Sequence, residues 1–83
     1  MQIDELKAER NRLRYKQRQM AEKLGISLAA YNSKENGKSS FTDDEKKTIS
    51  QMLHFTPYQM NKILYDGLLP IGPDGLLTIE EER

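Results

Sequence analysis

One stretch decides the fold, and it reads Gln17-Arg18-Gln19-Met20-Ala21-Glu22-Lys23-Leu24-Gly25-Ile26-Ser27, followed after seven residues by Glu35-Asn36-Gly37-Lys38. Its apolar residues recur at helical spacing, and Gly25 ends the run because only glycine adopts the left-handed conformation without strain. Ser27 is a typical N-cap for a second helix over residues 28–35, and an Asn-Gly pair ends that helix. The stretch therefore predicts a helix, a tight turn and a second helix.

The same residues meet the packing needs of a helix-turn-helix. Ala21 supplies a small side chain where the two helices cross closely, and Tyr31 supplies an apolar inner face. Lys34 lies three residues after Tyr31, so its stem should be partly buried on that face and its charge must reach solvent or a carboxylate. We therefore expect Lys34→Leu to stabilise the fold by about 1 kcal/mol.

Three further helices flank this pair. Residues 3–14 contain no Pro or Gly, and acidic residues in their first turn favour a helix. Residues 42–45 and residues 56–59 are capping boxes, the second with Pro57 at the first helical position. Each box begins a helix, and the last helix stops near Gly67. The sequence thus predicts an all-α fold of five helices within residues 1–67.

Residues 68–83 form a separate C-terminal tail. The tail is rich in apolar residues, namely Leu68, Leu69, Ile71, Leu76, Leu77 and Ile79. Residues 72–75 read Gly-Pro-Asp-Gly, which suits a type I turn. A short β-hairpin that supports a homodimer is one interpretation, and an extended acidic tail is the other. A hairpin would have to pack on its own domain or on a partner.

Composition excludes several classes of protein. With 83 residues and no cysteine, the chain has no disulfides, no thiolate metal site and no room for a large α/β enzyme. His54 is the only histidine, so we expect neither a zinc site nor a His-based catalytic triad. No apolar run approaches the roughly 20 residues that span a bilayer, and the N-terminus lacks a signal-peptide pattern. We expect a cytoplasmic protein that is not an enzyme and needs no cofactor.

The charges are segregated along the chain although the formal net charge is zero. Residues 1–40 hold nine bases and five acids, whereas residues 41–83 hold four bases and eight acids. A basic half suggests a polyanionic partner for one face of the protein. Two solvated surfaces of opposite sign remain the alternative.

These motifs resemble the Cro/C1-type (XRE-family) helix-turn-helix domains of phage repressors and Cro proteins. The resemblance covers about residues 3–66 and includes the five-helix, lambda-repressor-like plan. It implies a sequence-specific transcriptional regulator, most simply a small phage or bacterial repressor that occupies a promoter. Its implied partners are double-stranded DNA and a second copy of the chain, since such domains read half-sites about one helical turn apart as dimers. No small-molecule effector is expected.

The resemblance also implies roles for individual residues. The base-reading positions are Leu28, Ala29, Asn32 and Ser33. The implied phosphate-binding residues are Gln17, Lys38, Ser39 and Ser40. The basic residues Arg14, Lys16 and Arg18 join this set because their charges would supply further phosphate contacts. Arg10 and Glu35 match an ion pair that ties the first helix to the third. No Arg or Gln stands on the reading face, which favours A·T-rich sites or the reading of DNA shape.

A protein-interaction module on the same fold is the alternative function. Such a module would be an antirepressor, an antitoxin or an inhibitor of a host or phage protein. The net charge of zero and the apolar start of the second helix of the pair favour it. Selection of DNA sequences discriminates the two.

Overall fold

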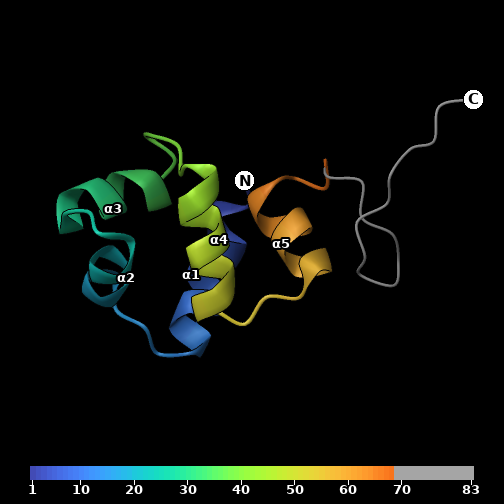
Figure 1. The fold of residues 1–83 in the computed structure, drawn as a ribbon, viewed down its shortest axis with the longest axis horizontal. Helices are drawn as coiled ribbons and strands as arrows, with labels where there is room; N and C mark the ends of the chain where they lie inside the picture. Colours follow the sequence, from blue (N-terminus) through green and yellow to red (C-terminus); the bar gives the residue numbers. More distant parts are fainter. Residues whose placement is uncertain (69–83) are drawn as a thin grey trace, which may run out of the picture.

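The computed structural model of the chain describes residues 1–68, which contain five α-helices and no strand. In chain order these are α1 (Ile3–Arg12), α2 (Gln17–Leu24), α3 (Leu28–Glu35), α4 (Asp43–Met52) and α5 (Pro57–Leu64). The predicted all-α, five-helix fold is confirmed. In Figure 1, α2 and α3 lie together at one end, α1 and α4 occupy the middle, and α5 lies at the other end. The predicted hairpin or extended tail lies, from residue 69 onward, outside the described residues.

Helices α3, α4 and α5 begin where the capping residues predict. The Ser27 side chain accepts a hydrogen bond from the Ala30 backbone N–H at 3.0 Å. Thr42 Oγ1 accepts from the Glu45 N–H at 3.1 Å, while Glu45 Oε1 accepts from the Thr42 N–H at 2.9 Å. An equivalent capping box starts α5. Each cap satisfies backbone donors that the first helical turn leaves free.

Two helices end earlier than the sequence predicts. α1 ends at Arg12 rather than residue 14, because Arg14 has a φ of 63°. α5 ends at Leu64 rather than near Gly67, and Asp66 and Gly67 both have positive φ. A residue in the left-handed region cannot continue a right-handed helix.

A single apolar core joins all five helices. Its members, each at most 4% exposed, are Leu6, Met20, Ala21, Tyr31, Phe41, Ile49, Leu53, Ile63 and Leu64. The rings of Tyr31 and Phe41 pack at a tilt, with centroids 5.7 Å apart. Because every helix contributes, the core holds the α2–α3 pair against the rest of the domain.

Candidate nucleic-acid interface

The turn between α2 and α3 depends on one glycine. Gly25 caps α2 with a φ of 72°, and its N–H donates to the Glu22 carbonyl at 3.1 Å. The next N–H, of Ile26, reaches back to the carbonyl of Ala21 at 3.0 Å. Ala21 itself is 2% exposed, as the close crossing of the two helices requires. Local sequence therefore sets the angle at which α3 leaves α2.

A buried carboxylate locks α3 to α1 and α2. Glu35 has no exposed surface and accepts two hydrogen bonds from Arg10: Nε to Oε2 at 2.8 Å, and one terminal guanidinium N–H to Oε1 at 3.1 Å. The Tyr31 hydroxyl donates to Oε2 at 2.6 Å, and Gln17 Nε2 donates to Oε1 at 2.9 Å. The predicted partners Arg10 and Glu35 are thus together, and three helices meet at one carboxylate.

The cluster sets the ionisation of its own members. Burial alone would raise the pKa of Glu35, but hydrogen bonds from Arg10, Tyr31 and Gln17 outweigh burial and lower that pKa. Burial, reinforced by the neighbouring carboxylate, raises the pKa of Tyr31. At neutral pH, Glu35 is therefore an ionised acceptor and Tyr31 a neutral donor.

A chain of hydrogen bonds continues from this cluster to the outer face of α3. Gln17 Oε1 accepts from Asn32 Nδ2 at 3.2 Å, and Asn32 Oδ1 accepts from Asn36 Nδ2 at 3.1 Å. Asn36 Oδ1 in turn accepts from Lys7 Nζ at 2.8 Å. Asn32 is consequently held at both ends of its amide. Sequence reasoning missed Asn36 and Lys7, although the spacing of four residues between Asn32 and Asn36 is a signal for such a pair.

The loop after α3 is pressed against α1. Gly37 has a φ of 81°, and a Cβ at this position would lie 2.6 Å from Cδ1 of Ile3. The Lys38 N–H donates to the Ser33 carbonyl at 2.9 Å and so closes the end of α3. Glycine therefore lets residues 38–40 turn beside the N-terminus of the chain.

The residues predicted to read bases are largely exposed. Leu28, Ala29 and Asn32 are exposed on α3, and Leu28 retains 43% of its surface. Ser33 is half-buried. Because the inner residues Tyr31 and Glu35 face the core, the structure leaves this side of α3 open to a partner.

The residues predicted to bind phosphate form two groups in the structure. Arg14 and Lys16 precede α2, and Gln17 and Arg18 begin it. The second group lies in the loop between α3 and α4 and consists of Lys38, Ser39 and Ser40. All are exposed except Gln17, which is half-buried with its amide bonded to Glu35.

A protein-family comparison decides the family. A model described as helix-turn-helix matches residues 6–58, more than half of the chain. The chain belongs to the XRE-type (Cro/C1-type) helix-turn-helix family. Accordingly it is a DNA-binding regulator of this type, in a family that is regulatory rather than enzymatic. Comparison with curated proteins and with solved structures finds no match.

Lys34 is half-buried on α3, three residues after Tyr31. Its Nζ lies 2.6 Å from Glu45 Oε1, and the two side chains are only 16% and 12% exposed. Of the two expected outcomes, solvent or a carboxylate, the structure shows the carboxylate. Burial would raise the pKa of Glu45, but hydrogen bonds from Lys34 and the Thr42 backbone lower it. The ion pair removes the basis for expecting Lys34→Leu to stabilise the fold.

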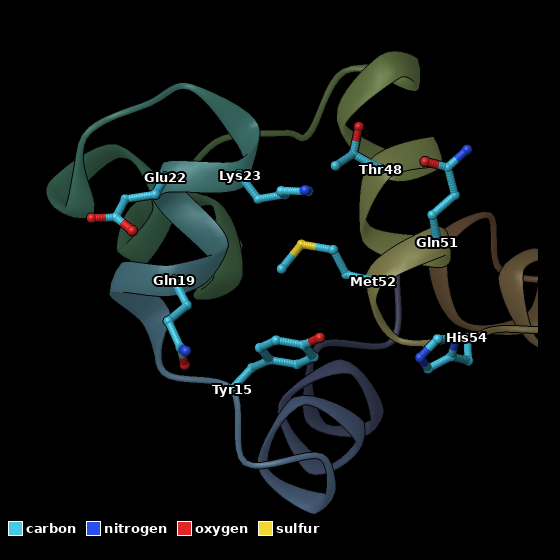
Figure 2. Close-up of a pocket in the computed structure, with 8 residues that line it drawn as sticks. All are labelled: Tyr15, Gln19, Glu22, Lys23, Thr48, Gln51, Met52 and His54. Atoms are coloured by element: carbon cyan, nitrogen blue, oxygen red, sulfur yellow. The ribbon is translucent and has the colours of Figure 1, made fainter.

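An open cleft of about 650 Å³ lies between α2 and α4 of this helix-turn-helix domain (Figure 2). It is lined by Tyr15, Gln19, Glu22, Lys23, Thr48, Gln51, Met52 and His54. Figure 2 shows Met52 reaching across toward α2 above the ring of Tyr15. None of these residues belongs to the predicted DNA-contacting set. Within residues 1–68 no group of side chains is suited to hold a metal ion, and no helix is long and apolar enough to cross a membrane.

Proposed function

We propose that the chain is a sequence-specific transcriptional repressor, of the kind found in phages and bacteria, that acts by occupying a promoter. One observation carries this proposal: the outer face of α3 is exposed while its inner face is fixed by the buried Glu35 cluster. A helix that enters the major groove needs both properties, because base contacts tolerate little rotation of the helix.

Base reading falls to Leu28, Ala29, Asn32 and Ser33 in this proposal. An Asn amide can pair with adenine, Ser can donate or accept, and the apolar residues can touch a thymine methyl group. Asn32 already spends one amide hydrogen and one oxygen lone pair on Gln17 and Asn36. These two hydrogen bonds fix the orientation of the Asn32 amide before it contacts a base. Because α3 itself contains no Arg or Gln, we expect a preference for A·T-rich sites or the reading of DNA shape.

Affinity comes mainly from phosphate contacts. The exposed bases Arg14, Lys16, Arg18 and Lys38 supply the charge, while Gln17, Ser39 and Ser40 supply uncharged hydrogen-bond donors. We propose a homodimer as the DNA-bound form, which would read two half-sites about one helical turn apart.

Selection from random duplex DNA at low and at physiological salt tests the proposal. We expect a shared short motif at both salts and an affinity that falls steeply with salt, because phosphate contacts release counterions. Two variants sharpen the result. Asn32→Ala should lower discrimination at one base pair by roughly 1–3 kcal/mol, whereas Lys38→Ala should weaken all sequences about equally. An unchanged motif with Asn32→Ala contradicts the reading role of Asn32.

The second candidate is a protein-interaction module. The 43% exposure of Leu28 at the start of α3 and the net charge of zero favour it. Under this alternative the selection would return no motif at either salt concentration.

A further inference from the structure

A second groove, of about 420 Å³, lies where three segments of the chain meet. The N-terminus, the loop between α3 and α4, and the end of α5 run along the upper edge of Figure 1. Ile3, Phe41 and Tyr65 give the groove an apolar lining, and Ser39 and Ser40 line it as well. The groove therefore shares two residues with the loop that is proposed to bind phosphate.

The chain leaves the described domain at this groove. Leu68 lines the groove, yet 83% of its own surface is exposed. Lys46 also lines the groove, and its Nζ lies 4.3 Å from the centroid of the Tyr65 ring. The Asp66 carboxylate lines the groove too, paired with the amino group of Met1. An apolar lining with Lys46 and two hydroxyls beside this paired carboxylate suits an occupant that is apolar along most of its length and acidic at one end.

The sequence that follows Leu68 has this composition. Residues 69–79 include five large aliphatic residues, namely Leu69, Ile71, Leu76, Leu77 and Ile79, and residues 80–82 are all Glu. Residues 69–83 contain four of the thirteen acids but only one of the thirteen bases. Consequently residues 1–68 carry a formal charge of +3 and residues 69–83 carry −3.

We infer that residues 69–79 occupy this groove on their own chain and bring Glu80, Glu81 and Glu82 beside the loop of residues 38–40. The segment begins at the rim of the groove, so its effective concentration there is far higher than that of a second copy. Its apolar residues lose water-exposed surface, and its carboxylates meet Lys46 and the hydroxyls of Ser39 and Ser40.

When residues 69–79 occupy the groove, the acidic residues that follow them compete with DNA for the loop of residues 38–40. The carboxylates face the same loop as the DNA phosphates would, and the segment must leave before that loop closes on DNA. This competition rests on the proposed function, whereas occupation of the groove does not.

Amide chemical shifts of the full-length protein test the occupation without DNA. Replacing two aliphatic residues, Leu76→Ser with Leu77→Ser, should shift the amides of Ser39, Ser40 and Tyr65. The amides of Gln19 and Glu22 in the other cleft should stay unchanged and report an intact fold. Unchanged amides at the groove overturn the inference. In the unmodified protein, the chemical shifts of these groove amides should not change on hundredfold dilution. If dilution moves them to the values of the double variant, a second copy supplies the segment, and the inference is overturned.

Binding to a selected DNA duplex tests the competition. Glu80→Gln, Glu81→Gln and Glu82→Gln together should tighten binding roughly threefold to tenfold at low salt, with less effect as salt screens the charges. The matched control removes three exposed acids elsewhere, Asp4→Asn, Glu22→Gln and Asp44→Asn. An equal gain in the control overturns the competition. If no variant binds DNA, the proposed function and the competition both fail, and the chemical shifts still decide the occupation of the groove.

Discussion

The two ends of the domain are held by different kinds of interaction. At the α2–α3 end, four hydrogen bonds converge on the buried Glu35 carboxylate. At the α4–α5 end, the contacts come from aliphatic side chains such as Ile49, Leu53 and Ile63. Hydrogen bonds depend on distance and angle, whereas apolar burial has no direction. The polar end therefore fixes the orientation of α3, and the apolar end mainly contributes to the stability of the fold.

The energetic cost of the two solutions also differs. Burying an ion costs several kcal/mol, which the Arg10–Glu35 pair recovers only because its geometry and added hydrogen bonds are favourable. An aliphatic side chain contributes about 1.5–3 kcal/mol on burial with no such cost. We interpret the polar cluster as a device for orienting the proposed reading helix.

The largest effect is expected from breaking the polar end. Arg10→Ala should lower the free energy of unfolding by about 3–5 kcal/mol, because it leaves the Glu35 carboxylate buried without a cation. Leu53→Ala, the matched change at the apolar end, should cost about 2–5 kcal/mol through lost contacts and a cavity. Denaturant melts of both variants give the two values.

A double variant separates orientation from stability. Arg10→Met with Glu35→Met removes both charges and should recover most of the stability that Arg10→Ala loses. It should nevertheless discriminate less between DNA sequences than Leu53→Ala does under conditions where both are folded. A double variant as unstable as Arg10→Ala would show that the cluster is needed for stability itself.

Acid should weaken the polar end first. The pKa of Glu35 is lower in the folded chain than its ordinary value near 4.5, so its stabilising contribution is complete above that pH. The contribution is lost as the pH falls through the lowered pKa, at up to about 1.4 kcal/mol per pH unit for each proton bound. Glu45 acts in the same direction. Urea melts between pH 7 and pH 3 should show a shallower loss for Glu35→Gln than for Leu53→Ala, and equal slopes would contradict the assignment.

Interactions between residues close in the sequence are predictable from the sequence, whereas contacts between distant helices are not. The caps at Ser27, Thr42 and Thr56 involve neighbours within three residues, so sequence alone predicts them. The bond between Lys7 and Asn36 spans 29 positions and exists only because α1 packs against α3. The residue pattern of the sequence does not predict that bond. The Arg10–Glu35 pair is predicted only by the family resemblance.

Lys34 illustrates the same limit, because its partner lies on another helix. Sequence reasoning treats its ammonium group as poorly placed, whereas the structure pairs it with Glu45. Losing a hydrogen bond between charged groups costs about 1.5–3 kcal/mol, which exceeds the gain from a better-packed Leu. Lys34→Leu should therefore destabilise the fold by about 1 kcal/mol.

A double-mutant cycle with Glu45→Gln checks this sign. Without the carboxylate, Lys34→Leu should become neutral or stabilising, because no buried charge is left unpaired. Denaturant melts of the four proteins give the coupling. The preferred DNA sequence should stay the same in all of them, since this pair faces away from the exposed side of α3. A single variant Lys34→Leu that is more stable than the parent protein would restore the sequence-based expectation.

The smallest expected effect compares two similar helix ends, those of α1 and α4. Arg14 follows α1 with a φ of 63°, and His54 follows α4 with a φ of 57°. In both cases the next N–H, of Tyr15 or Phe55, reaches a carbonyl five residues back, at 3.0 and 2.9 Å. Glycine adopts this conformation without the strain that a side chain adds.

His54→Gly and Arg14→Gly should each stabilise the fold by about 0.5–1 kcal/mol, less the entropy that glycine adds to the unfolded chain. Thermal melts measure this shared gain. DNA binding should separate the two variants, because Arg14 belongs to the proposed phosphate-binding set and His54 lies in the α2–α4 cleft. Arg14→Gly should weaken binding to all sequences and reduce its salt dependence, while His54→Gly should leave both unchanged. Equal binding by the two variants would remove Arg14 from the interface and leave the start of α2 and the loop after α3 to hold the phosphates.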